Sequence, residues 1–294
     1  MYYRRKILLA LLEQLGGKLD KISLQKLLFL FTCQQESASF HFVPYKLGCY
    51  SFQANADLKT LSTYKQVSDN ECFWEIIDDK YYFPDLKKID KAALKNTVSR
   101  YGNLDRDKLI KLTYTNYPYY AINSTIADKL LSEDELNKVK IQRPCKAETV
   151  LFTIGYEGIS LEQYINKLIL NDVKVLCDVR KNPVSMKFGF SKNQLIKACH
   201  GVGIEYIHIP EVGIENDKRR ELKTQADYDH LFMYYKEHIL STETAKQQEI
   251  LELLIHKKRI AFTCFEANIC QCHRKHLAES IAHMHGFKYE VVHI

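Results

Sequence analysis

The sequence contains no apolar run that approaches the roughly 18–20 residues needed to cross a membrane, so we expect no membrane-spanning segment. It begins with MYYRRKILLALLEQLGG, which lacks a small-residue cleavage site, and this absence argues against a signal peptide. There is no internal repeat and no low-complexity tract. Apolar residues occupy 46% of the 294 positions, as in an ordinary globular protein, and this proportion excludes disorder along the whole chain.

A disulfide framework is also missing. The nine Cys residues are scattered and odd in number, so complete pairing would leave one over. Together with the lack of a signal peptide, this favours free thiols in a reducing compartment, and we expect a cytoplasmic protein. The one dense group is formed by Cys264, Cys270, Cys272, His273 and His276.

Charge is unevenly distributed along the chain. The formal net charge is +6, but residues 1–148 hold 23 Lys+Arg against 18 Asp+Glu, whereas residues 149–294 hold 19 against 18. A basic front half is consistent with a polyanionic partner such as nucleic acid. An ordinary solvated surface explains the same excess of basic residues. For the assembly state, a homodimer stays open.

The composition of the sequence changes from polar to apolar over residues 141–149. A polar stretch, IQRPCKAET, is followed by the apolar run TVLFTIGYEG, which is typical of a domain boundary before a strand. We therefore divide the chain into a front domain over 1–84, a helical connecting region over 85–147 and an α/β domain over 148–294.

The front domain shows the element order of a winged helix. Apolar spacing predicts three helices. The first covers 4–15, the second is LQKLLFLFTCQ with Ser23 as its N-cap, and the third covers 52–63. Two short β runs, 72–77 and 80–83, flank an acidic pair that is typical of a tight turn. Winged helices contact DNA or RNA in some proteins and other proteins in others, and both roles stay open here. The candidate phosphate contacts are Lys18, Lys21, Lys46, Lys59 and Lys65, each of which could equally be a plain surface lysine.

The same domain carries a modest family likeness. The stretch KISLQKLLFLF, followed by FVPYKLGCYSFQANADLKTL, resembles the Panacea, or SocA-like antitoxin, pattern. Cys49 occupies the position that is Pro in the "YGPYS" turn of that family. The resemblance covers about 45 residues. It implies a regulatory or partner-binding use in phage, toxin or defence settings and no particular chemistry.

The back half alternates strands and helices. Strands are predicted over 149–156, 173–180, 204–210, 259–266 and 289–294, and helices over 160–171, 191–203, 227–240, 243–256 and 272–286. This order predicts a mostly parallel sheet with helices on both faces, whose ligands bind at the carboxyl ends of the strands.

Polar side chains follow four of these strands. They are Tyr156 with Glu157, Asp178 with Arg180, Pro210 with Glu211, and Cys264 with Glu266, and the next helix opens with Cys272-His273-Arg274. Because parallel strands end at one edge of the sheet, we expect these groups to converge in a single site. Asp178 and Arg180 could instead form a structural ion pair, and Cys264 could be a small core residue.

These motifs are similar to those of the domain-of-unknown-function 488 family, in the order TIGYEG, DVRKNPVSMKFGFSKNQL, GIEYIHIPEVG and TCFEANICQCHRKHLAE. The family signature falls on Tyr156, Asp178, Arg180, Pro183, Ser185, Phe190, Ser191, Pro210, Gly213, Cys264, Glu266, Cys272, His273 and Arg274. The chain departs from the family's "PELGG" turn, where it has Val212 and Ile214. The resemblance implies a fold and a site but no settled reaction.

Three chemistries fit these residues: hydrolysis by acid/base catalysis, a zinc site and a cysteine nucleophile. The dense Cys/His group has enough soft ligands for zinc, but adjacent Cys272 and His273 should point in diverging directions and no CxxC pair is present. The zinc deaminase signature is also absent, so we predict no metal and no cofactor. Alternatively, Cys272 at a helix N-terminus beside Arg274 would have a lowered thiol pKa and act as a nucleophile.

We favour hydrolysis of a nucleotide or nucleic acid, at an N-glycosidic or phosphoester bond, in DNA repair or phage defence, with the front domain on DNA. The predicted catalytic residues are Asp178, Glu266, Cys272 and His273. The predicted substrate-binding residues are Tyr156, Arg180, Ser185, Cys264 and Arg274. A non-enzymatic sensor of a nucleotide or modified base is the alternative, and a pure protein-interaction module is a third class.

Overall fold

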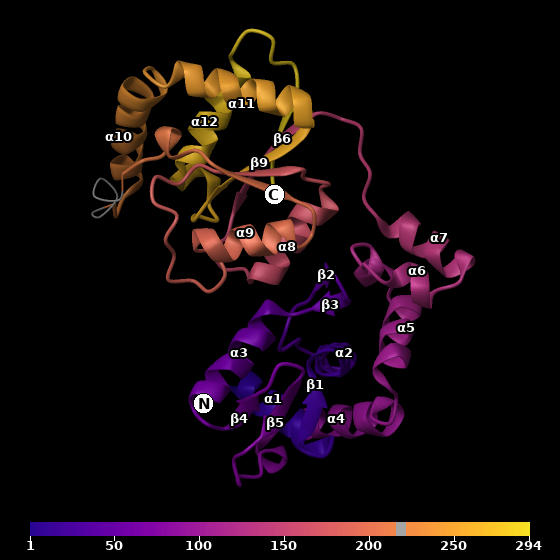
Figure 1. Ribbon diagram of the computed structural model, residues 1–294. Helices are drawn as coiled ribbons and strands as arrows, with labels where there is room; N and C mark the ends of the chain where they lie inside the picture. The colour runs from indigo at the N-terminus through magenta and orange to yellow at the C-terminus, as the bar shows by residue number, and fades with distance from the viewer. Residues whose placement is uncertain (216–221) are drawn as a thin grey trace. The chain divides into compact units, whose positions relative to one another are not determined.

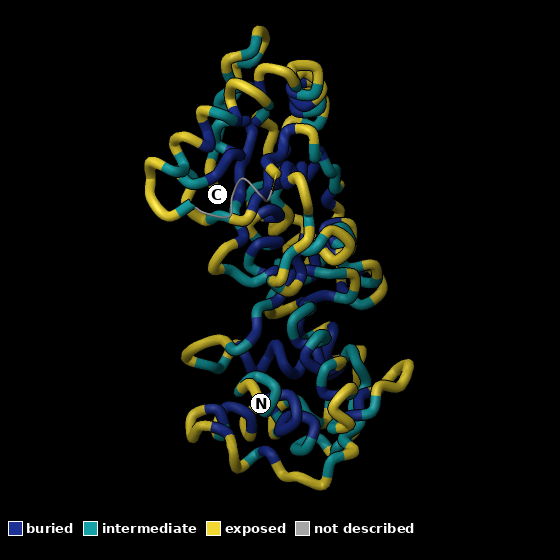
Figure 2. The backbone as a smooth tube through the Cα atoms, turned by 90° about the vertical axis from the view of Figure 1, so that its left-hand side faces the viewer, coloured by how far each residue is buried: buried dark blue, intermediate teal, exposed yellow. Residues whose placement is uncertain are grey.

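The computed structural model describes residues 1–215 and 222–294. The chain forms two compact units, Met1–Arg143 and Pro144–Ile294, and their boundary falls within the segment where the composition changes (Figure 1). Buried backbone is concentrated inside each unit (Figure 2), and each has an apolar core of its own. Every helix in the described residues is too short or too polar to cross a lipid bilayer.

The N-terminal unit is mainly helical, as expected. Its elements are α1 (Tyr3–Gln14), β1 (Lys18–Asp20), α2 (Lys21–Thr32), β2 (Val43–Tyr45), β3 (Gly48–Tyr50), α3 (Phe52–Thr63), β4 (Val67–Asp69), β5 (Phe73–Ile76), the 3-10 helix η1 (Phe83–Asp85), α4 (Lys88–Tyr101), α5 (Arg106–Asn116), the 3-10 helix η2 (Pro118–Ala121), α6 (Ala127–Leu130) and α7 (Glu133–Gln142). Helices α4 and α5 supply buried side chains to the same core as α1 and α2.

The start of α2 differs from the prediction. Asp20, and not Ser23, is the N-cap, and its Oδ1 accepts hydrogen bonds from the backbone N–H groups of Ile22 and Ser23. A carboxylate at this position satisfies two of the N–H groups that a helix start leaves without partners. Ser23 lies inside the first turn and is buried.

The predicted hairpin between 72–77 and 80–83 is wrong. Strand β5 instead pairs antiparallel with β4 and β1, in the order β1-β5-β4. The chain after β5 does not extend the sheet because the Glu13 carboxylate accepts hydrogen bonds from the N–H groups of Tyr82 and Phe83. The winged-helix assignment stays a prediction.

The C-terminal unit alternates strands and helices. Its elements are β6 (Val150–Gly155), α8 (Leu161–Leu170), β7 (Val175–Asp178), α9 (Lys192–His200), β8 (Glu205–His208), the 3-10 helix η3 (Pro210–Val212), α10 (Gln225–Tyr235), the π-helix η5 (Lys236–Leu240), α11 (Thr244–Lys257), β9 (Arg259–Cys264), the 3-10 helix η6 (Ile269–Gln271), α12 (His273–Ala282) and β10 (Glu290–His293).

These strands form the predicted parallel sheet. The order is β10-β6-β9-β7-β8, and all four neighbouring pairs are parallel. Helices α8 and α9 cover one face, and α10, α11 and α12 cover the other (Figure 1). Strands buried on both faces require nearly continuous apolar sequence, which is why β7 and β9 are buried at every position.

Helix α8 illustrates how local sequence and packing agree. Ser160 caps it, and Gln163 completes a capping box by returning a hydrogen bond to the Ser160 N–H group. Its apolar residues recur at helical spacing and bury one face against the sheet. Leu168 is fully buried, whereas Leu170 on the opposite side is 53% exposed.

We expect Leu168→Ala to lower the free energy of unfolding of the C-terminal unit by about 2–5 kcal/mol, because it removes buried methyl groups and leaves a cavity. Leu170→Ala is the matched control and should change this free energy by less than about 0.5 kcal/mol. Urea denaturation followed by circular dichroism measures both. Equal losses in the two variants would contradict the packing of α8.

Candidate functional site

The candidate site lies where the winding of the sheet changes direction. Strand β9 sits between β6 and β7, with Gly155 beside Cys264 and Asp178 beside Thr263. The helix after β9 covers one face, whereas the helices after β6 and β7 cover the other (Figure 1). This arrangement opens a crevice at the carboxyl ends of these three strands.

A cavity of about 330 Å³ occupies this crevice. Its wall includes six predicted site residues, which are Tyr156, Arg180, Ser185, Cys264, Glu266 and His273. The other three predicted residues, Asp178, Cys272 and Arg274, do not line the cavity and are buried behind it. The expected convergence therefore occurs, in a layer that faces the cavity and a layer that supports it.

Asp178 and Arg180 form a buried, bidentate ion pair. Arg180 Nε donates to Asp178 Oδ1 at 2.8 Å and one terminal nitrogen donates to Oδ2 at 2.5 Å. Tyr206 Oη donates to the same Oδ2 at 2.6 Å. Asp178 is fully buried with both carboxylate oxygens engaged, so it holds Arg180 in place and has no access to the cavity.

Arg180 also ties neighbouring loops together. Its other terminal nitrogen donates to Tyr156 Oη at 2.8 Å and to the Phe190 carbonyl oxygen at 2.9 Å. The Tyr156 ring stacks on Phe190, with centroids 4.2 Å apart and planes at 8°. Burial alone would lower the pKa of Arg180, but the hydrogen bond and negative charge of Asp178 outweigh it, so the pKa is raised. Arg180 is thus a fixed cation in the cavity wall.

Cys264, Glu266 and His273 form a second group in the wall. Cys264 Sγ lies 3.2 Å from Glu266 Oε2 and 3.6 Å from His273 Nδ1. His273 Nε2 donates to the Val179 carbonyl oxygen at 3.0 Å. Because a carbonyl oxygen can only accept, this bond leaves Nδ1 as the acceptor nitrogen on the side of Cys264.

Cys272 joins this group from behind. The ligand atoms of Cys264, Cys272 and His273 all lie within 4.8 Å of one another. The expectation that Cys272 and His273 diverge is wrong: Cys272 is the extended N-cap of α12 and His273 its first helical residue, and this bend directs both side chains to Cys264. Cys270 is exposed and outside the cluster, and His276 Nδ1 contacts Glu279 at 3.2 Å.

The expected activation of Cys272 is also contradicted. Burial, followed by the neighbouring Cys264 thiol, raises the pKa of Cys272 well above its ordinary value, and Arg274 offsets this only in part. The Arg274 guanidinium instead donates to the carbonyl oxygens of Glu266, at 2.6 Å, and Ala267. A free Cys272 is therefore a thiol at neutral pH and a poor nucleophile.

Gly155 allows the segment after β9 to approach closely. A Cβ atom at this position would lie 1.9 Å from the Glu266 carbonyl oxygen and 3.1 Å from the Arg274 side chain. Glycine is therefore required for the contact that sets Glu266 beside the end of β6.

The loop from Lys181 to Phe190 forms the other rim of the cavity. Ser185 is held by Ser191, whose hydroxyl accepts from the Ser185 N–H group and donates to its carbonyl oxygen. Lys187 Nζ donates to the Tyr156 carbonyl oxygen at 2.6 Å, and burial lowers its pKa, with Glu157 opposing. Lys187 and Tyr206 were not among the predicted site residues. The cation-rich loop after a strand was a usable signal for Lys187, whereas the sequence offers none for Tyr206.

The five predicted lysine contacts do not gather in one place. Lys18 and Lys21 pair with Glu75 and Asp69. Lys21 and Lys46 line a second cavity of about 330 Å³, in the N-terminal unit, whereas Lys18, Lys59 and Lys65 do not.

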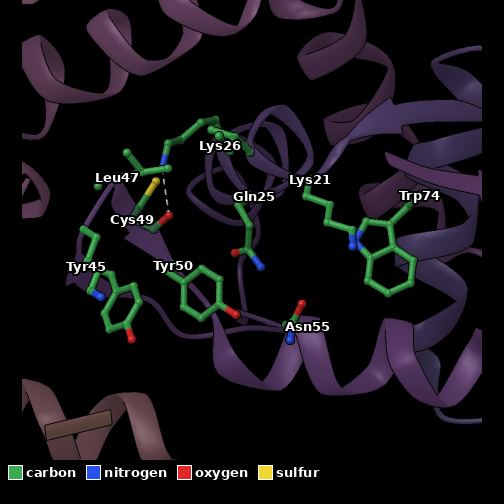
Figure 3. A pocket seen from close by; sticks show the side chains of 12 residues that line it. Lys21, Gln25, Lys26, Tyr45, Leu47, Cys49, Tyr50, Asn55 and Trp74 are labelled. Carbon is green, nitrogen blue, oxygen red and sulfur yellow. Dashed lines mark hydrogen bonds between the residues drawn. The ribbon is translucent and has the colours of Figure 1, made fainter. Parts of the chain in front are cut away.

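The second cavity contains a buried lysine (Figure 3). Lys26 reaches from α2 and donates to the Cys49 carbonyl oxygen at 3.0 Å. Burial lowers the pKa of Lys26, while the adjacent Cys49 opposes this shift. On the other side of the cavity, Lys21 Nζ lies 4.8 Å from the centre of the Trp74 ring.

The C-terminal unit is thus a parallel α/β domain with a polar site at its strand ends. Residues 160–281 match the family described as "Domain of unknown function DUF488", which confirms the resemblance that the motifs predicted. Tyr156 lies just before the matched residues, and the match does not extend to the N-terminal unit, whose antitoxin-like resemblance stays a prediction. No curated protein matches the chain.

Asp178→Asn should lower the free energy of unfolding of the C-terminal unit by about 3–5 kcal/mol, because it leaves the Arg180 charge buried without its counter-ion. Tyr206→Phe removes one hydrogen bond to a carboxylate and keeps the ion pair, so it should cost less, about 1.5–3 kcal/mol. Urea denaturation compares the two. Similar costs would show that the ion pair does not support the site.

Lys26 should make stability depend on pH. Because burial lowers its pKa, the unfolded chain holds this proton to higher pH than the folded chain. The free energy of unfolding of the N-terminal unit should therefore rise with pH between the lowered pKa and the ordinary value of about 10.4.

Lys26→Met should remove this rise and increase stability at pH 7, because the unfavourable burial of a charged ammonium group is removed. Urea denaturation from pH 7 upward tests this. Lys59→Met, at an exposed position of α3, is the control and should retain the rise. A Lys26→Met curve parallel to the wild-type curve would contradict the assignment.

Proposed function

We propose that the C-terminal unit is a hydrolase that acts on a nucleotide or a nucleic acid, at a phosphoester or N-glycosidic bond. The observation that carries this proposal is the combination in one cavity wall of three cations, Arg180, Lys181 and Lys187, with a half-buried carboxylate, Glu266. Excess positive charge favours a phosphate-bearing substrate, and a carboxylate beside it can transfer protons.

The rim of the cavity suits a base. Phe265 lines it with 42% of its surface exposed, and a nucleobase can stack on such a ring. Val184 and Met186 also line the cavity and are more exposed still, at 72% and 102%. Apolar side chains that stay open to solvent beside a cationic cavity favour a ligand with both a flat face and a charge.

The roles within the proposed site follow from access. Glu266 is the general acid or base because it is in the wall, whereas Asp178 positions Arg180 from behind. Arg180 and Lys187 bind the anionic group. Cys264 lies next to the Glu266 carboxylate, and His273 lies next to Cys264.

We assign the N-terminal unit to contact with nucleic acid. Lys46, Lys59 and Lys65 are exposed, and within the described residues no ion pair engages them. The excess of basic residues in the front half supports the same role. DNA repair or phage defence would be the setting of such a protein.

Binding without turnover is the second candidate. The observation that favours it is the Arg180 network, in which Asp178, Tyr156 and Phe190 already take up four donor bonds. A guanidinium held this firmly is already positioned to recognise a nucleotide or a modified base, and such recognition needs no group that transfers a proton.

The test is turnover of nucleotides and of single- and double-stranded oligonucleotides by the full chain, with products detected by mass spectrometry. Glu266→Gln should slow hydrolysis by about 10²- to 10⁴-fold while substrate affinity stays within a few-fold. Glu290→Gln is the control, because this exposed carboxylate starts β10 at the opposite edge of the sheet.

Two results would count against hydrolysis. One is full activity in Glu266→Gln. The other is an absence of turnover combined with nucleotide binding that Lys187→Ala abolishes, and this result would support the sensor.

A further inference from the structure

The cluster of Cys264, Cys272 and His273 has the geometry of a metal site. Ligands about 2.3 Å (sulfur) and about 2.0 Å (nitrogen) from a tetrahedral zinc ion lie about 3.6 Å from each other. The distance from Cys264 Sγ to His273 Nδ1 is 3.6 Å, and Cys272 Sγ lies within 4.8 Å of both atoms. Two thiols and an imidazole are the soft donor set that zinc prefers.

The contact behind His273 supports the same conclusion. Its Nε2–H donates to the Val179 carbonyl oxygen at 3.0 Å, which fixes the ring and leaves the Nδ1 lone pair directed at the cluster. Metal-binding histidines almost always hold their second nitrogen in this way. In the metal-free chain the Cys264 thiol can donate to this nitrogen, so a metal ion would replace that proton.

We propose that Cys264, Cys272 and His273 bind one zinc ion, with the fourth position open to the cavity. The opening follows from the wall, since Cys264, His273 and Glu266 all line it. Three protein ligands with one open position are typical of catalytic zinc sites, whereas structural sites have four protein ligands. Glu266 Oε2, 3.2 Å from Cys264 Sγ, lies beside that open position.

The consequence for chemistry rests on the proposed hydrolase function. On zinc binding, the two thiols lose their protons to solvent. The zinc ion, the two thiolates and the imidazole together then carry no net charge. A water molecule in the fourth position would give one proton to Glu266 and attack the phosphorus as hydroxide. The new bond forms between this oxygen and phosphorus, the bond to the leaving oxygen breaks, and Glu266 passes its proton to the leaving group.

The first experiment is metal analysis of the purified full chain by inductively coupled plasma mass spectrometry. We expect about one zinc ion per chain, and at least a tenfold lower content in Cys264→Ser, Cys272→Ser and His273→Ala. Cys270→Ser is the matched control, because Cys270 is exposed, two positions from Cys272 and outside the cluster, so its zinc content should equal that of the wild type. Zinc retained by all three cluster variants would overturn the site.

A second measurement covers the case in which these buried substitutions unfold the unit. Cobalt(II) added to the metal-free wild-type chain should give a thiolate-to-cobalt charge-transfer band and the intense visible bands of tetrahedral coordination, in Cys270→Ser as well. A chain without zinc, whose cobalt spectrum is that of the aqueous ion, would overturn the site, and so would a Cys264–Cys272 disulfide in the freshly purified chain.

Failure of the site and failure of the proposed function are distinguishable. Zinc bound with no hydrolysis of any nucleotide leaves the metal site standing and overturns the hydrolase. Hydrolysis at the full rate by the metal-free chain leaves the hydrolase standing and overturns the role of zinc in the reaction.

Discussion

The buried ion pair between Asp178 and Arg180 is the interaction on which the rest of the C-terminal site depends. Through it, the end of β7 is joined to Tyr156 after β6, to Tyr206 in β8 and to the carbonyl group of Phe190 before α9. A buried pair of charges gains little net stability, because desolvation opposes attraction, but the loss of one partner is costly. The pair therefore serves less to stabilise the fold than to fix the relative positions of the strand ends.

The architecture of the C-terminal unit was predictable because parallel strands leave a strong sequence signal. Apolar runs such as 173–180 alternate with amphipathic helices, and the carboxyl ends of such strands must share an edge. The location of the site followed from this rule. The role of Asp178 did not, because it depends on its contact with Tyr206, 28 positions away, whose hydroxyl takes up the carboxylate oxygen that a substrate would need.

The errors in the N-terminal unit have the same origin. The spacing of aromatic residues over 80–83 is correct for a strand, yet the N–H groups of Tyr82 and Phe83 are taken by Glu13, about 70 positions earlier in the chain.

In the C-terminal unit, the adjacent positions of Cys272 and His273 argued against binding of one metal ion by both. That argument assumes regular backbone on both sides of the pair. The change from extended to helical backbone at Cys272 removes that assumption. Local pattern predicts elements well and predicts poorly those positions where a distant side chain competes for the backbone.

The position of the single tryptophan has a practical consequence. Trp74 is the only indole in the chain, it is 2% exposed, and it lines the cavity of the N-terminal unit. Intrinsic fluorescence excited at the indole band therefore reports on one half of the protein without any labelling. The catalytic candidate lies in the other half, whose aromatic residues are Tyr and Phe. A ligand that binds only to that half could therefore change this emission only through communication between the two units.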